Sequence, residues 1–231
     1  MSRATMRAAV LCLLAWLPMV AAAAGSGYDV ERYADAGEAV RFVQHEWARV
    51  HYRSPEDERQ AALEALAEHA RAVADRFEGR ADVLVWEAIC ISTYAGSLEG
   101  LSQFQAIGLV QEARDRLLEA EAIDPEALNG SVYTSLGSLY YQVPGWPLGF
   151  GDADQARAYL KKALAINPDG IDPNYFYGDF LREEGDYAAA EKALTKALRA
   201  PQRPDRPVAD AGRREEVRAA LARVRERLAK R

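Results

Sequence analysis

Cysteine is scarce in this chain of 231 residues, which contains only Cys12 and Cys90. Cys12 lies in a leader-like segment, so Cys90 alone would remain after processing and could form no internal disulfide, even in an oxidising compartment. We therefore expect packing to stabilise the fold, with Cys90 as a small buried apolar residue.

Histidine is also rare, and the common catalytic patterns are missing. The three histidines are His45, His51 and His69, and no histidine follows His45 at the four-residue spacing of a zinc protease. The chain has no Gly-x-Ser-x-Gly motif, and its glycine-rich stretch at 145–151 lacks the Lys-Ser/Thr ending of a phosphate-binding loop. We expect no enzymatic activity, no metal site and no cofactor.

After the first 24 residues the chain has no apolar run long enough to span a bilayer. Arg3 and Arg7 precede an apolar run at 8–20, and four alanines follow at 21–24. A run of about a dozen apolar residues is too short for a membrane span, and small residues at its end are typical of a cleavage site. Residues 1–24 are therefore predicted to be a cleaved signal peptide that directs the protein to the periplasm or outside the cell, a retained anchor being the alternative.

The charge is negative overall and uneven along the chain. The formal net charge is -6, whereas residues 199–231 carry ten Arg and one Lys against five acidic residues. An acidic protein is a poor candidate for nucleic-acid binding. The basic segment is expected either to lie against the acidic remainder or in solvent, or else to form an interaction surface.

One helical spacing occurs three times in the chain. Ala, Leu and Ala at spacings of four and three residues, followed by Pro, occupy Ala113, Leu117, Ala120, Pro125; Ala156, Leu160, Ala163, Pro168; and Ala190, Leu194, Ala197, Pro201. Small Ala lets two helices approach closely, Leu fills the space between them, and Pro ends the helix. The last two blocks are 34 residues apart, which is the tetratricopeptide repeat (TPR) period.

Residues 83–201 resemble three to three and a half TPR repeats, with Leu136-Gly137 and Tyr177-Gly178 at the Leu-Gly positions of the first helices. The resemblance implies an all-α, right-handed solenoid of helical hairpins. Residues 25–82 are predicted to be a degenerate first repeat, and residues 202–231 a Pro/Arg connector followed by a capping helix. The chain also resembles an uncharacterised group of exported bacterial TPR proteins and, in architecture, the periplasmic TPR component of TRAP-type transporters.

Extra residues within the repeats predict two insertions, near 94–107 and 142–151. The second contains Trp146 and Phe150 among prolines and glycines, which exclude helix. Leaving both rings in water forfeits about 2 kcal/mol or more each, so the loop is expected to fold back on a repeat or to contact a partner.

The resemblance also implies a concave groove lined by first-helix positions. Together with the loop residues Trp146 and Phe150, the candidate binding residues are Thr134, Ser138, Tyr141, Gln142, Tyr175, Asp179 and Arg182. Hydroxyl and amide groups bind extended backbone or polar ligands, and tyrosine adds contact area at low entropic cost. Asp172 precedes Pro173 and is expected to cap the helix that follows.

These observations predict a non-enzymatic scaffold of the bacterial cell envelope that binds a polypeptide or a subunit of an envelope complex. The alternative is a periplasmic protein that binds a small molecule and works with a solute transporter.

Overall fold

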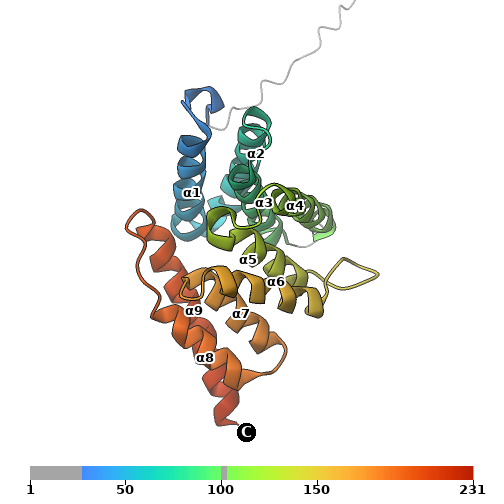
Figure 1. Ribbon diagram of the computed structural model, residues 1–231, viewed down its shortest axis with the longest axis vertical. Helices are drawn as coiled ribbons and strands as arrows, with labels where there is room; N and C mark the ends of the chain where they lie inside the picture. Colours follow the sequence, from blue (N-terminus) through green and yellow to red (C-terminus); the bar gives the residue numbers. More distant parts are fainter. Residues whose placement is uncertain (1–27, 100–102, 231) are drawn as a thin grey trace, which may run out of the picture.

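The computed structural model describes residues 28–99 and 103–230, and within them the chain forms nine α-helices, one short 3-10 helix and no β-strand. The elements follow one another around a curved stack (Figure 1). They are η1 (Val30–Arg32), α1 (Ala36–Arg53), α2 (Glu56–Arg76), α3 (Ala81–Gly96), α4 (Gln103–Ile123), α5 (Ala127–Gln142), α6 (Ala153–Ile166), α7 (Ile171–Glu183), α8 (Tyr187–Leu198) and α9 (Pro207–Ala229).

Consecutive helices pack as pairs, α3 on α4, α5 on α6 and α7 on α8. The repeated Ala, Leu and Ala positions of the second helices are fully buried between the members of each pair. Glycine on the first helix makes this approach possible: a Cβ at Gly137 would lie 2.6 Å from Cγ of Leu160, and one at Gly178 would lie 2.7 Å from Cγ of Leu194. The all-α hairpin fold predicted from the repeat spacing is therefore confirmed.

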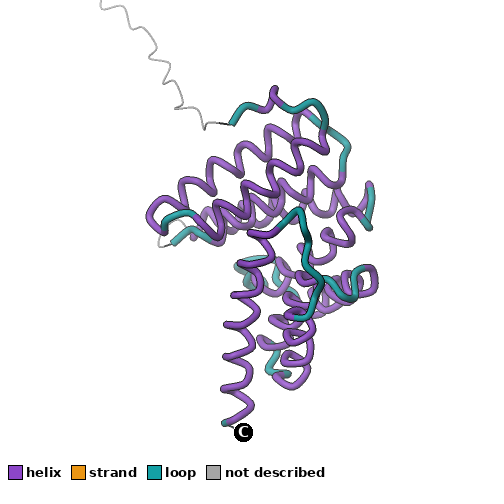
Figure 2. Tube along the Cα trace, turned by 90° about the vertical axis from the view of Figure 1, so that its left-hand side faces the viewer, coloured by secondary structure: helices purple, strands orange, loops and turns teal. Residues whose placement is uncertain are grey.

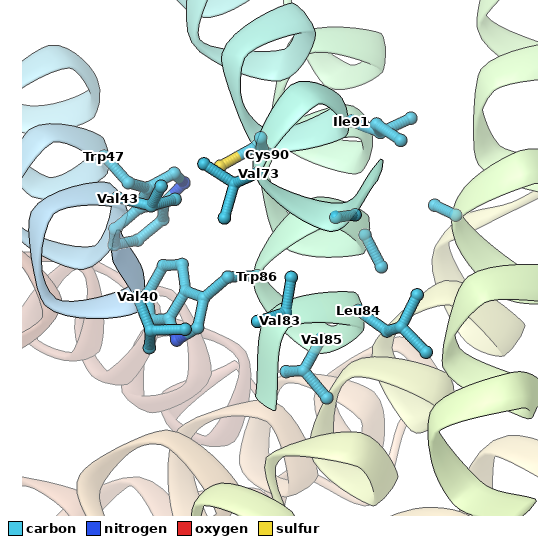
Figure 3. Packing of buried hydrophobic residues seen from close by; sticks show 14 of the residues in the cluster. Val40, Val43, Trp47, Val73, Val83, Leu84, Val85, Trp86, Cys90 and Ile91 are labelled. Atoms are coloured by element: carbon cyan, nitrogen blue, oxygen red, sulfur yellow. The ribbon is translucent and has the colours of Figure 1, made fainter. Parts of the chain in front are cut away.

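Two clusters of buried side chains form the interior. The larger one joins α1 to α5, and Figure 3 shows Trp47 of α1 and Trp86 of α3 within it, near Val40 and Val43. Cys90 is buried in the same cluster, and burial raises the pKa of its thiol. The smaller cluster joins α6 to α9.

The carboxyl-terminal helix α9 packs along α8 and α7 and also contacts α1 at the other end of the chain (Figure 1). Figure 2 shows it as a long helix preceded by a loop, the connector (residues 199–206). Its buried face contains Val217, Ala220, Leu221 and Val224. Within the described residues, the basic segment thus lies against its own protein.

The insertion predicted near 94–107 lies largely in helix. Helix α3 continues to Gly96 and α4 begins at Gln103, so most of the extra residues extend the two helices. The insertion at 142–151 is a loop, since α5 ends at Gln142 and α6 begins at Ala153.

The predicted signal peptide, residues 1–24, lies outside the described residues. Among the helices that the structure does describe, none has both the length and the apolar character needed to cross a membrane.

A buried carboxyl group lies between α3 and α4. Glu87 is 1% exposed, and its Oε2 lies 3.3 Å from Nε of Arg116. Burial outweighs the attraction of Arg116 and raises the pKa of Glu87 to about 7. The folded state therefore binds the proton of Glu87 more tightly than the unfolded state does. Its contribution to folding stability is fully present below the ordinary pKa of a glutamate side chain and is lost as the pH rises through about 7.

Glu87→Gln is therefore expected to stabilise the protein at pH 8, by about 1–3 kcal/mol, and to have little effect at pH 5. Urea unfolding followed by circular dichroism at both pH values measures this difference. Glu119→Gln is the matched control, because Glu119 is half exposed and pairs with the same arginine. An equal effect of Glu87→Gln at both pH values would contradict the assignment.

Candidate functional site

The helical stack contains a groove of about 650 Å³. First helices of the pairs provide one wall, with Ser131, Thr134, Ser138 and Gln142 of α5 and Tyr175 of α7. Helix α1, the connector and α9 provide the opposite wall. A volume in this range suits a short peptide segment or a small molecule.

Four of the predicted site residues line this groove: Thr134, Ser138, Gln142 and Tyr175. The Thr134 hydroxyl is buried and donates to the carbonyl oxygen of Gly130 at 3.3 Å, so it contributes mainly shape. Ser138 and Gln142 are more exposed. The Ser138 hydroxyl donates to the carbonyl oxygen of Ser135 at 2.9 Å and the Gln142 amide to the Tyr141 hydroxyl at 3.1 Å, so the hydroxyl oxygen of Ser138 and the side-chain carbonyl oxygen of Gln142 remain as acceptors.

The predicted residues Tyr141, Asp179 and Arg182 form a separate cluster, which holds α5 against α7. The Tyr141 hydroxyl donates to Asp179 Oδ2 at 2.9 Å, and Arg182 Nε donates to Oδ1 of the same carboxylate at 2.9 Å. Burial, followed by the negative charge of Asp179, raises the pKa of Tyr141 well above its usual value. These side chains bond to one another and do not line the groove.

The two aromatic residues of the aromatic loop, residues 143–152, behave differently: one folds back on the helices and the other is exposed. Phe150 folds back, with its ring 5.5 Å from that of Tyr140 and the Arg114 guanidinium 4.6 Å above it. Trp146 is 90% exposed, and Leu148 beside it is also exposed. One ring therefore anchors the loop, and the other lies in solvent at its tip.

This division predicts unequal losses of stability for two substitutions in one loop. Phe150→Ala is expected to destabilise the protein by about 1–3 kcal/mol, since it removes a packed ring and a cation–π contact. Trp146→Ala is expected to change stability by less than about 0.5 kcal/mol, because the ring has little contact to lose. Thermal unfolding of both variants is the measurement, and equal losses of stability would contradict this description.

The groove is closed on one side by an ionic cluster, the seam, which joins α7 to the connector and α9. Asp172 is its centre: its Oδ2 accepts from Arg203 Nη1 at 2.8 Å, and its Oδ1 accepts from Arg213 Nε at 2.9 Å. Arg203 also donates to Asp210 at 2.7 Å, and Arg213 donates to Glu216 at 2.5 Å. Each charge in the seam has an opposite partner.

The role expected for Asp172 was wrong. Helix α7 begins two residues earlier than expected, at Ile171 instead of Pro173, and its N-cap is Gly170. Asp172 therefore lies in the first turn, where its carboxylate points to the seam arginines. Burial alone would raise the pKa of Asp172, but Arg213 and Arg203 lower it to about 2.

The seam continues to α1, at the other end of the chain. Glu216 Oε1 lies 3.4 Å from Nε2 of His51, and His51 and Arg213 hold the pKa of Glu216 below its usual value despite burial. Gly212 lies against the ring of Tyr52, where an added Cβ would be 2.5 Å from Cε1 and closer still to two other ring carbons. The first and last helices thus meet through this contact and close the groove.

Sequence analysis missed the seam because its members are far apart in the chain and form no motif. The available signal was charge complementarity between the basic segment 199–231 and the acidic remainder. In the part of the chain that is described, no group of three or more His, Cys, Asp or Glu side chains is arranged to hold a metal ion.

Comparison with known proteins supports the repeat assignment. Residues 148–211, which span α6 to the start of α9, match the tetratricopeptide repeat family. The fold is similar to the crystal structure of a thermophilic TPR protein from Thermus thermophilus, with a TM-score of 0.59 and 18% sequence identity over 83% of this chain and 84% of that one. No match was found among curated proteins. A TPR fold is characteristic of protein-interaction scaffolds, which are generally not enzymes.

Proposed function

We propose that this chain is an exported, non-enzymatic scaffold that binds a polypeptide segment, or a subunit of an envelope complex, in the groove between α5, α7 and α9. The observation that carries the proposal is the groove itself. Its wall presents the hydroxyl and amide groups of Ser131, Ser138 and Gln142 and the ring of Tyr175 on rigid helices.

These groups suit an extended polypeptide. The two serine hydroxyls donate to helix carbonyl oxygens, Ser131 to Leu128 at 2.7 Å and Ser138 to Ser135 at 2.9 Å, so each offers its oxygen as an acceptor for a backbone N–H. The Gln142 amide donates one N–H to the Tyr141 hydroxyl at 3.1 Å and keeps its carbonyl oxygen and its second N–H for the backbone of a partner. Rigid helices hold them in place before binding, which reduces the entropy lost on association. Exposed Trp146 at the tip of the neighbouring loop offers a large ring to the same partner. Tryptophan is enriched among the few interface residues that contribute most of the binding free energy.

The envelope location is supported by the amino-terminal sequence. Two arginines, an apolar run and a series of alanines are typical of a signal peptide. After removal of the signal peptide the single remaining cysteine is Cys90, which is buried and has no partner for an internal disulfide. The fold therefore does not depend on a disulfide and is compatible with an oxidising compartment.

Affinity capture from native envelope extract, with identification by mass spectrometry, tests the proposal. Gln142→Arg places a bulky charged side chain at the groove, and Gln155→Arg makes the same change at an exposed position of α6 outside it. The wild type and Gln155→Arg are expected to enrich the same polypeptide, while Gln142→Arg, still folded by circular dichroism, loses it. Equal capture by both variants would reject the groove as the binding surface.

A second function is favoured by the volume of the groove. About 650 Å³ is enough for a small molecule, as in a periplasmic binding component that serves a solute transporter. That function predicts saturable binding of one solute by the purified protein, which equilibrium dialysis against radiolabelled solutes would detect.

A further inference from the structure

One end of the groove holds buried hydrogen-bond donors that no described residue satisfies. They include Trp86 Nε1, Arg206 Nε and Arg59 Nε, all of whose residues line the groove, and His51 Nδ1 and the Tyr52 hydroxyl of the same lining are also without a hydrogen-bond partner in the described part of the chain. Trp86 is only 4% exposed. Its neighbour Trp47 shows the usual arrangement, since its indole N–H donates to Thr93 Oγ1 at 2.9 Å.

A buried donor without an acceptor costs free energy, so most such groups in proteins are paired. Several such unpaired donors line one pocket. Arg59, Trp86 and Arg206 come from α2, α3 and the connector: α2 packs directly on α3, and the connector leads into α9, which contacts α1. These donors have no acceptor among the described residues and are open to one from a ligand.

The charges of the pocket indicate which acceptor. Arg203 and Arg213 pair with Asp172, Asp210 and Glu216 in the seam. Within the described residues Arg59 and Arg206 have no carboxylate partner: Arg59 donates to the carbonyl oxygen of Ser54, and Arg206 lies over the ring of Trp86 at 5.2 Å. Four arginines against three carboxylates leave one positive charge, which a single negative charge would balance.

The walls beside these donors are apolar. The rings of Trp47 and Trp86 lie 6.0 Å apart at a steep angle, and both face the space between α1 and α3 (Figure 3). Leu63 and Ile89 extend the same lining. Such a surface suits an aromatic or aliphatic body attached to the charged group.

We propose that this pocket binds an organic monocarboxylate, whose carboxylate accepts hydrogen bonds from Arg206, Arg59 and Trp86 and whose apolar body lies against Trp47 and Trp86. A carboxylate matches the planar guanidinium donors. A dianionic phosphate would meet greater repulsion from Asp172 and Glu216, which line the same groove. The carboxylate belongs either to a free organic acid or to the end of a bound polypeptide, and in the second case the inference rests on the proposed function.

Isothermal titration calorimetry of the signal-processed protein tests the site with defined probes. The free-acid arm compares 3-phenylpropionate with 3-phenylpropanamide, which has the same body but no charge. The polypeptide arm compares the pentapeptide Gly-Ser-Gly-Ala-Phe with a free carboxyl terminus and with an amidated one. We expect at least one carboxylate probe to bind more tightly than its amide, by a factor of about ten or more. The reason is that charge-assisted hydrogen bonds are stronger than neutral ones.

Arg206→Gln is expected to weaken that binding by about tenfold or more. Arg225→Gln is the matched control, because it removes the same charge from an exposed position of α9 outside the groove. Its affinity should equal that of the wild type.

Binding of 3-phenylpropionate alone would identify a free acid as the ligand, and binding of the free pentapeptide alone a chain terminus. Equal affinity of acid and amide in both arms, absence of saturable binding by the wild type, or unchanged affinity in folded Arg206→Gln would each overturn the proposal. The titration uses no cellular partner, so its result is separate from that of the capture experiment.

Discussion

Replacing Gly212 with alanine is expected to separate the first turns of α9 from α1 and to open the groove. An added Cβ would overlap the ring of Tyr52 at Cγ and Cδ1. Cγ lies on the Cβ–Cγ bond about which the ring of Tyr52 rotates, so rotation of the ring does not move this atom and does not remove the overlap. Overpacking of this kind costs about 1–3 kcal/mol. In an unobstructed helix the same substitution stabilises by about 1 kcal/mol, so the sign of the effect reports the contact.

Gly108→Ala supplies that unobstructed comparison. Gly108 is exposed within α4, and a Cβ there would meet no atom within 4 Å. Urea unfolding should show Gly108→Ala to be as stable as the wild type or more so, and Gly212→Ala to be less stable. Hydrogen exchange should also accelerate in the last turn of α1 in Gly212→Ala alone. A gain of stability in both variants would mean that α9 does not close on α1.

Asp172→Asn is expected to destabilise the protein by about 2–4 kcal/mol, because two guanidinium groups lose their shared carboxylate in a partly buried cluster. Asp169→Asn is the matched control on the preceding loop. Asp169 is 76% exposed and, among the residues described, pairs with Lys196 alone, at 3.2 Å, so its substitution should cost less than about 0.5 kcal/mol. Unfolding in urea at pH 7 compares the two variants.

The effect of Asp172→Asn should also depend on pH in a defined direction. The pKa of Asp172 is lowered to about 2 in the folded state, so its stabilisation is present above its ordinary value of 3.8 and is lost as the pH falls through about 2. The stability difference between wild type and Asp172→Asn should therefore be constant from pH 7 to about 5 and shrink towards pH 2. A difference that grows on acidification would contradict the ion-pair assignment.

The paired helices could be predicted from the sequence because their determinants are local. The spacing of Ala, Leu and Ala fixes one buried stripe, and Gly137 and Gly178 identify the helices that approach it closely. The same periodicity places first-helix residues three or four positions apart on one face, so Ser138 and Tyr175 lie in the groove where the resemblance implied.

The remainder of the site depends on contacts between distant parts of the chain. Tyr141, Asp179 and Arg182 have groove-like spacing but bond to one another across α5 and α7, which spacing alone does not reveal. The seam and the pocket donors Arg206 and Trp86 depend on where α9 returns to α1. The charge of the terminal segment indicated attraction to the rest of the chain, without indicating the place of contact.

The sequence also did not predict which ring of the aromatic loop packs on the helices and which is exposed. Composition showed that Trp146 and Phe150 would need contacts, but it did not distinguish the anchored ring from the exposed one. Phe150 has Tyr140 and Arg114 within reach, whereas Trp146 is carried to the tip of the loop.

The most direct test of the account is site-specific photo-crosslinking in cells, with a photoreactive amino acid placed in turn at Ser138, Trp146 and Gln155. Ser138 lies in the groove, Trp146 at the loop tip, and Gln155 on the exposed side of α6. We expect Ser138 to crosslink to a discrete polypeptide that Gln155 does not reach, with Trp146 crosslinking to the same species. Crosslinks from Gln155 to that polypeptide, with none from Ser138, would show that partners bind the outer surface and that the groove is not the binding site.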